Sequence, residues 1–194
     1  MNPVKIFAIS GSLRSGSLNS MLLRAAARLA PPGISVELYR DLGTLPLFNP
    51  DLEIADPRPV AALRQRIIGS DAVLIASPEY ARGVTGAIKN ALDWMVGNES
   101  FVDKPVGLLN ASPRSTIAQA ALRETLVTMS AHIVPSACVT VPVLGSGLDE
   151  DGIINHVEIG LVIVSVLSTL QSASPDREPH HANVKTAKAV RARR

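Results

Sequence analysis

The sequence contains few aromatic residues. They make up 3% of its 194 residues, with one Trp, two Tyr and three Phe. Proteins that bind single-stranded nucleic acid stack bases on exposed aromatic rings, so this class is poorly supported. The formal net charge is only +2, and residues 171–194 hold six Lys/Arg against two acidic residues, which leaves the rest of the chain slightly acidic. We therefore expect no nucleic-acid partner.

Cysteine and long apolar runs are nearly absent as well. The single cysteine, Cys138, cannot form an intramolecular disulfide or a cluster of thiolate ligands for zinc, so a reducing compartment is the natural location. No stretch reaches the roughly 18–20 apolar residues that span a bilayer, and the first apolar run is too short for a secretion signal. These features predict a cytoplasmic protein without a membrane partner.

Candidate metal ligands are few. His180 and His181 are adjacent, but no Cys or carboxylate lies at ligand spacing from them. The acidic run 149–151 precedes a predicted helix, where acidic side chains serve as caps and as partners of the helix dipole. We predict no metal site.

The residues that are present describe a globular chain. Hydrophobic residues make up 46% of the sequence and charged residues 19%, and the length fits one domain. Apolar periodicity stops near Gln171, where Ser and Pro precede a Lys/Arg-rich end. We therefore predict one domain over residues 1–170 and a basic, disordered tail over residues 171–194.

Strand and helix patterns alternate along the predicted domain. Runs rich in branched residues, typical of strands buried on both faces, alternate with amphipathic stripes of helical period. The predicted strands are 4–9, 34–39, 72–76, 105–109 and 133–141, and the predicted helices are 18–29, 58–69, 84–95, 115–130 and 153–170. In the last helix, Ile154, Val157, Leu161 and Val164 are expected to face inward. The alternation predicts an α/β fold with a doubly wound, five-stranded parallel sheet, helices on both faces, and ligands at the carboxyl ends of the strands.

A Ser/Gly-rich loop, residues 10–19, joins the first strand to the first helix. The start of a helix exposes unpaired N–H groups, so such a loop can bind a phosphate, with Arg14 neutralising its charge. Ser17-Leu18 stands where an ATP- or GTP-binding loop requires Lys-Ser/Thr, and Leu13 interrupts the dinucleotide pattern G-x-G-x-x-G. A terminal monophosphate remains the best candidate. The alternative is that Ser17 merely caps the helix and the glycines ease a turn.

A second loop, residues 77–83, follows the third predicted strand. In a sheet of order 2-1-3-4-5, strands one and three flank the point where the strand order reverses, so the two loops lie side by side. Backbone amides there would face the edge of a ring, and Tyr80 is available to pack against it. Flavin mononucleotide (FMN) fits both loops.

At these residues the chain resembles the NADPH-dependent FMN reductase family, of flavodoxin-like fold, which includes quinone, chromate and azo-dye reductases. The resemblance covers about residues 1–170. It rests on the sequence GSLRSGSLN at 11–19, LPLFNPDL at 45–52, and SPEY together with GAIKNALDW within 77–94. The family usually has Asn where this chain has Ala81.

The resemblance also implies a cofactor site. Residues of the first loop would hold the FMN phosphate, residues of the second would line the isoalloxazine, and Ser112 would complete the ring site. The expected cofactor-binding residues are Ser10, Ser12, Arg14, Ser17, Leu18, Asn19, Pro78, Glu79, Tyr80, Ala81, Arg82, Gly83 and Ser112. Arg82 would either recognise the 2′-phosphate of NADPH or lie in solvent. No catalytic side chain is expected, because the flavin performs the chemistry.

The implied activity is that of an FMN-dependent NAD(P)H oxidoreductase. NADPH or NADH would donate a hydride, and quinones, azo or nitro compounds, metal ions or free flavin would accept electrons in ping-pong order. The family also implies a homodimer or homotetramer. The alternative function is that of a flavodoxin-type electron carrier without its own NAD(P)H activity.

Overall fold

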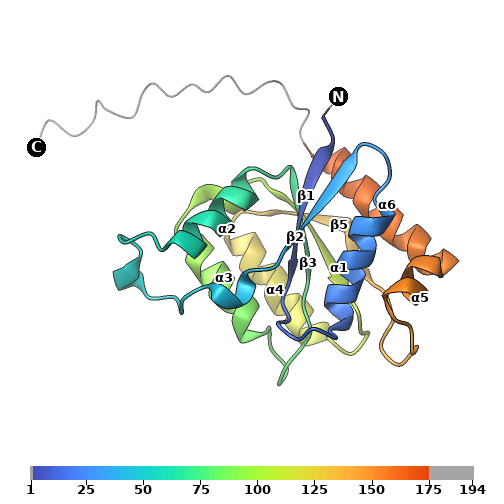
Figure 1. Ribbon diagram of the computed structural model, residues 1–194. Coiled ribbons are helices and arrows are strands. Elements are labelled where there is room, and N and C mark those ends of the chain that lie inside the picture. The colour runs from blue at the N-terminus through green and yellow to red at the C-terminus, as the bar shows by residue number, and fades with distance from the viewer. Residues whose placement is uncertain (1, 175–194) are drawn as a thin grey trace, which may run out of the picture.

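A parallel five-stranded sheet forms the centre of the molecule (Figure 1). The computed structural model describes residues 2–174. The strands are β1 (Val4–Ser10), β2 (Ile34–Tyr39), β3 (Ala72–Ala76), β4 (Pro105–Asn110) and β5 (His132–Thr140), in the order β2-β1-β3-β4-β5. The sequence-based prediction of fold class and strand order is confirmed.

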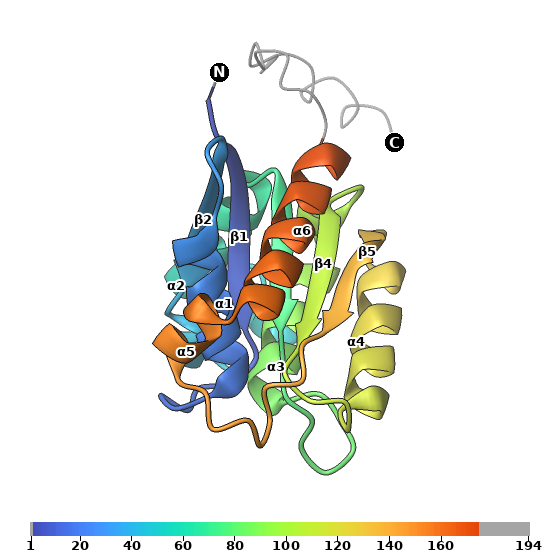
Figure 2. The same ribbon diagram turned by 90° about the vertical axis from the view of Figure 1, so that its right-hand side faces the viewer.

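Helices cover both faces of the sheet (Figure 2). They are α1 (Leu18–Leu29), α2 (Arg58–Ile68), α3 (Gly86–Val96), α4 (Thr116–Thr128), α5 (Glu150–Asn155) and α6 (Val157–Ala173), with short 3₁₀ turns η1 (Leu42–Thr44), η2 (Pro50–Leu52) and η3 (Glu99–Phe101). Because successive strand residues point to opposite faces, Ile6 and Ala8 pack in the core beneath α1, α5 and α6, while Phe7 and Ile9 pack in the core beneath α2, α3 and α4.

The end of the fold differs from the prediction of one helix over residues 153–170. The chain forms two helices, because His156 breaks the first and caps the second, its Nδ1 accepting a hydrogen bond from the backbone N–H of Ile159 (3.5 Å). The break changes the helical phase. Val157 and Leu161, expected to face inward, are 74% and 66% exposed, whereas the buried residues of α6 are Ile163, Val166, Leu167 and Leu170.

The predicted tail lies almost wholly outside the described residues. Helix α6 continues to Ala173, three residues beyond the predicted boundary at 170, and residues 175–194 are not among those described. Within residues 2–174, no helix has both the length and the apolar character needed to cross a bilayer.

Strand β5 pairs with β4 in two separate stretches. Val106 pairs with Ile133 and Leu108 with Cys138, so residues 134–137 of β5 form a bulge opposite a single residue of β4, Gly107. A Cβ atom on Gly107 would lie 3.0 Å from the carbonyl oxygen of Ala137. A side chain here would press on the bulge, so this position of β4 favours glycine.

Candidate functional site

A cavity of about 360 Å³ lies where β1, β3 and β4 end. This is the sheet edge at which the two ligand loops were expected to meet. The lining residues come from the loops after β1, β3, β4 and β5, and they are Ser12, Arg14, Gly16, Ser17, Leu18, Asn19, Pro78, Glu79, Tyr80, Ala111, Ser112, Arg114, Ser115 and Leu144.

One end of the cavity is the N-terminus of α1. The Ser17 hydroxyl caps the helix by accepting a hydrogen bond from the backbone N–H of Ser20 (3.4 Å). The backbone N–H groups of Leu18 and Asn19 have no acceptor among residues 2–174. These N–H groups and the helix dipole favour an anion, and Arg14 adds a positive charge beside them. The donor set at this end fits a phosphate.

Asn19 links this end of the cavity to the loop after β4. Its side chain is 6% exposed, and its Oδ1 accepts a hydrogen bond from the backbone N–H of Ala111 (3.2 Å). The amide group Nδ2 makes no hydrogen bond within the described part of the chain and can donate to a ligand. Asn19 therefore both orders the loop and lines the cavity.

Glu79 joins the opposite wall of the cavity to α4. Its Oε2 accepts hydrogen bonds from the backbone N–H groups of Ile117 (3.0 Å) and Ala118 (2.9 Å). Ser115, at the N-cap position of α4, makes no side-chain capping hydrogen bond, so Glu79 satisfies the orphan donors from outside the helix. Its carboxylate holds two cavity loops together, a different role from that of a general base.

The tip of the loop after β3 is a tight turn. Tyr80 and Gly83 exchange both backbone hydrogen bonds, at 3.1 and 3.0 Å. The two central residues, Ala81 and Arg82, have φ of 49° and 61°, the left-handed backbone that a type I′ turn requires. Tyr80 lines the cavity and is 56% exposed, so the cavity opens to solvent at this turn.

The loops after β1 and β3 are joined directly. The Gly11 backbone N–H donates to the Ala76 carbonyl (2.8 Å), and the Thr85 hydroxyl donates to the Gly11 carbonyl (2.5 Å). A Cβ atom on Gly11 would overlap the side chain of Ser77. Glycine is thus needed here because the two loops approach closely.

The structure brings nine of the thirteen predicted site residues to this cavity. They are Ser12, Arg14, Ser17, Leu18, Asn19, Pro78, Glu79, Tyr80 and Ser112. Ala81, Arg82 and Gly83 are not part of its lining, and Ser10 lines a different cavity.

Five further lining residues were not predicted. They are Gly16, Ala111, Arg114, Ser115 and Leu144. Gly16 belongs to the Ser/Gly-rich loop 10–19, in which other residues were predicted. The other four follow the ends of β4 and β5, and this position after a strand was the only sequence feature that could have indicated them.

Comparisons with known proteins agree with this architecture. The family model of NADPH-dependent FMN reductase matches residues 4–143. An NAD(P)H-dependent FMN reductase of Pseudomonas aeruginosa is 42% identical over 135 residues, which cover 66% of this chain and 72% of that protein. A probable NADPH:quinone oxidoreductase of Oryza sativa subsp. japonica is 36% identical over 180 residues, covering 87% and 91% respectively.

A solved structure shows the same fold. FerB, a flavoenzyme NAD(P)H:(acceptor) oxidoreductase from Paracoccus denitrificans, superposes with a TM-score of 0.74 at 29% identity, covering 89% of this chain and 100% of that chain. Fold and cavity together define a doubly wound α/β protein with a cavity at the carboxyl ends of its strands, the place where proteins of this fold class bind nucleotides. More specifically, the chain belongs to the NADPH-dependent FMN reductase family. It is an oxidoreductase that uses FMN and NAD(P)H, as the sequence predicted.

Proposed function

We propose that this protein holds FMN in the cavity at the ends of β1, β3 and β4 and passes electrons from NAD(P)H to quinone-like acceptors. The observation on which the proposal depends is the pair of unpartnered N–H groups at Leu18 and Asn19, next to Arg14 and in a cavity of about 360 Å³. A flavin phosphate supplies the anion that these donors lack. The names of the quinone-reducing relatives support the acceptor class.

The residues of this chain position the cofactor and shield one side of it. FMN, when bound, would supply the hydride and electron-transfer chemistry that no side chain of this protein can perform. Arg14 and the first turn of α1 would hold the phosphate, and Pro78 and Tyr80, which line the same cavity, would border the ring. The exposure of Tyr80 at the mouth of the cavity supports entry of donor and acceptor in turn, as ping-pong turnover would require.

One experiment separates this proposal from an electron carrier. Purified protein is loaded with FMN, desalted and mixed anaerobically with NADPH while the flavin absorbance is followed. We expect retained flavin that bleaches, and rapid recovery of the absorbance on addition of a quinone. Retained flavin that stays oxidised with both NADPH and NADH would support the carrier, and failure to retain flavin would refute the cofactor site.

A matched pair of variants links the result to the cavity. Arg14→Met removes a charge-assisted hydrogen bond to the phosphate and is expected to raise the Kd for FMN by about tenfold or more. Arg58→Met, on the exposed first turn of α2 and remote from the cavity, is the control and is expected to bind FMN normally. Equal affinity of both variants would place the phosphate elsewhere.

We further propose a homodimer or homotetramer in a reducing, cytoplasmic compartment. Leu47 and Ile54 are 82% and 97% exposed. They belong to residues 45–56, in which Leu45 is buried and Phe48 packs against Trp94, while the teal part around η2 stands away from the sheet and helices in Figure 1. Such exposed apolar side chains favour contact with another subunit. The lone, half-buried Cys138 is compatible with a reducing compartment.

A further inference from the structure

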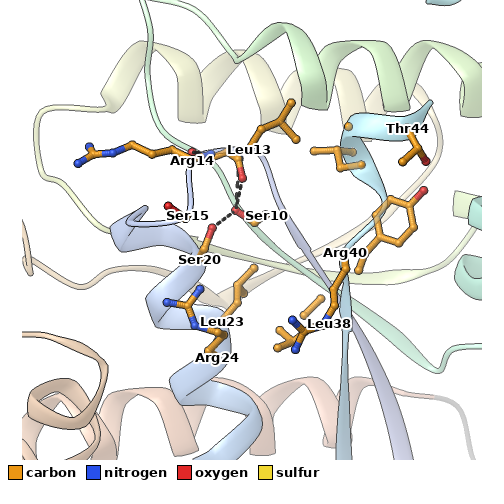
Figure 3. Close-up of a pocket in the computed structure, with 15 residues that line it drawn as sticks. Ser10, Leu13, Arg14, Ser15, Ser20, Leu23, Arg24, Leu38, Arg40 and Thr44 are labelled. Atoms are coloured by element: carbon orange, nitrogen blue, oxygen red, sulfur yellow. Dashed lines mark hydrogen bonds between the residues drawn. The ribbon is translucent and has the colours of Figure 1, made fainter. Parts of the chain in front are cut away.

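Figure 3 shows a second cavity, of about 420 Å³. The cavity at the ends of β1, β3 and β4, proposed above to hold FMN, is called the flavin cavity from here on. The second cavity is formed by the carboxyl ends of β1 and β2, the first turns of α1, and η1. Ser12 and Arg14 line both cavities, so the two adjoin. In Figure 3 the Arg14 side chain extends away from the second cavity, which leaves other residues to determine what this cavity binds.

The second cavity has an apolar wall and one hydroxyl donor without a partner among the described residues. Leu23, Leu38 and Leu42 provide apolar surface, and the hydroxyls of Ser10 and Ser20 hydrogen-bond each other (2.7 Å). Tyr39 also lines the cavity and is 7% exposed, yet its hydroxyl has no hydrogen-bond partner among residues 2–174. The hydroxyl oxygen is not among the buried, unpartnered side-chain atoms of the described residues, so it is accessible and can donate a hydrogen bond to a ligand in this cavity. Burial also raises the pKa of Tyr39, which keeps the phenol protonated as a donor.

Two arginines line one end of the cavity, their guanidinium groups on opposite sides in Figure 3. Arg24 is engaged by Glu150, with 2.5 Å between its Nε and the carboxylate Oε2. Arg40 forms no ion pair within the described part of the chain. Asp41 is the nearby carboxylate that opposes an anion, but it is exposed and does not line the cavity. Arg40 is therefore available to a ligand anion.

We infer that the second cavity binds the adenosine phosphate half of NADPH, with the base on the apolar surface, Tyr39 donating to it or to the ribose, and Arg40 facing the 2′-phosphate. This inference rests on the proposed function, because the donor must place its nicotinamide on a flavin in the adjoining cavity. FMN fills that cavity, so the rest of the dinucleotide needs its own surface. An apolar slot with an arginine at one end suits a phosphorylated nucleoside.

The test uses the FMN-loaded enzyme and 2′,5′-ADP as the probe. We expect 2′,5′-ADP to bind with heat detectable by calorimetry and to compete with NADPH. Arg40→Leu should weaken 2′,5′-ADP binding by about tenfold and raise the KM for NADPH to the same extent. Because NADH lacks the 2′-phosphate, the kcat and KM measured with NADH should stay nearly unchanged. Tyr39→Phe should weaken the binding of both 2′,5′-ADP and AMP, and Arg58→Leu is the control that should leave both unchanged.

Several results would overturn the inference. Inorganic phosphate that binds as tightly as 2′,5′-ADP would show a simple anion site. Loss of NADPH preference in Arg82→Leu instead of Arg40→Leu would place the 2′-phosphate at the turn beside the flavin cavity. An active flavoenzyme that does not bind 2′,5′-ADP would refute this inference alone, whereas a protein that binds 2′,5′-ADP at Arg40 but retains no FMN would refute the proposed function alone.

Discussion

At the scale of single residues, Gly11 and Glu79 hold the loops around the flavin cavity in place through contacts with distant parts of the chain. Gly11 permits the loop after β1 to approach Ser77, and Glu79 connects the loop after β3 to the start of α4. Neither role is visible in a sequence pattern, because each depends on a partner far along the chain. The position of both residues in cavity loops was predictable, but their contacts were not.

Gly11→Ala is expected to destabilise the protein. The added methyl group overlaps Ser77 in a buried region, so either the Ala76 or the Thr85 hydrogen bond must give way, at a cost of about 1–3 kcal/mol. Chemical denaturation measures this difference. Gly86→Ala is the matched control, because no atom lies within 4 Å of a Cβ at that position, and it should be neutral or slightly stabilising. Equal effects of the two substitutions would contradict the proposed loop contact.

Glu79→Ala is expected to loosen α4 and the cavity together. It removes the acceptor for the Ile117 and Ala118 N–H groups, which should lower the free energy of unfolding by about 0.5–2 kcal/mol. The Kd for FMN should rise as well, because the two loops that Glu79 joins both line the cavity. Glu79→Gln retains an acceptor oxygen but no charge and should lie between wild type and Glu79→Ala. A Glu79→Gln variant with wild-type FMN affinity but no turnover would instead indicate a proton-transfer role.

At the scale of elements, the turn after β3 has a conformation that its residues disfavour. Ala81 and Arg82 both have positive φ, whereas Asn-Gly is the sequence that a type I′ turn favours. Left-handed backbone costs a non-glycine residue about 1–2 kcal/mol. The family's usual Asn at position 81 fits this geometry better than the Ala of this chain.

The double variant Ala81→Asn with Arg82→Gly is expected to stabilise the protein by about 1–2 kcal/mol, since it relieves strain at both positions. Thermal unfolding of the wild type and the double variant provides the measurement. Arg82→Lys keeps the strain and should show no gain. Destabilisation by Arg82→Gly would reveal an interaction of the arginine side chain that outweighs the strain.

The C-terminal end of α2 depends on a lysine from the segment before β4. Lys104 Nζ donates to the carbonyl oxygen of Ser70 (2.5 Å), just beyond the helix. Burial lowers the pKa of Lys104, and the charge of Asp71 opposes that shift only in part. The unfolded chain therefore holds this proton more tightly than the folded chain, so protonation of Lys104 reduces stability at neutral pH.

Lys104→Met is expected to lower the free energy of unfolding by about 1 kcal/mol at neutral pH, because the Ser70 carbonyl loses its donor. The deficit should widen as the pH rises from the lowered pKa toward the ordinary lysine pKa, because only the wild type is relieved of a buried charge over that range. Urea denaturation of both proteins across this pH range gives the difference in their free energies of unfolding. The contributions of other titrating groups are the same in both proteins and cancel in this difference. A deficit that shrinks with rising pH would contradict the assignment.

At the scale of the whole molecule, the sequence predicted the layers and strand order because hydrophobic period and chain topology act over whole elements. It predicted the last helix wrongly, since a helical stripe assumes unbroken phase and His156 breaks it. It grouped Ser10 with the other predicted cofactor residues, and in the folded chain Ser10 lines the second cavity and not the cavity at the ends of β1, β3 and β4. Which of two adjoining cavities a loop residue lines depends on backbone direction, and composition does not encode it.

Assembly also belongs to this scale. If residues 45–56 contact another subunit, the double variant Leu47→Ser with Ile54→Ser should shift the protein toward monomer in light scattering, while Val157→Ser, on the other face of the molecule, should not. Removing exposed side chains costs little folding stability, so unfolding should stay near the wild-type value. A variant that remains assembled would exclude this segment as the contact.

The bulge in β5 has a consequence for solubility during and after folding. β5 is an edge strand, and the unpaired N–H and C=O groups of a regular edge would be a template for pairing with another chain. Residues 134–137 interrupt that edge, and Pro135 within them has no N–H to offer. The bulge therefore reduces the tendency of the β5 edge to pair with a strand of another molecule. Straightening it would expose a continuous strand edge to every neighbouring molecule.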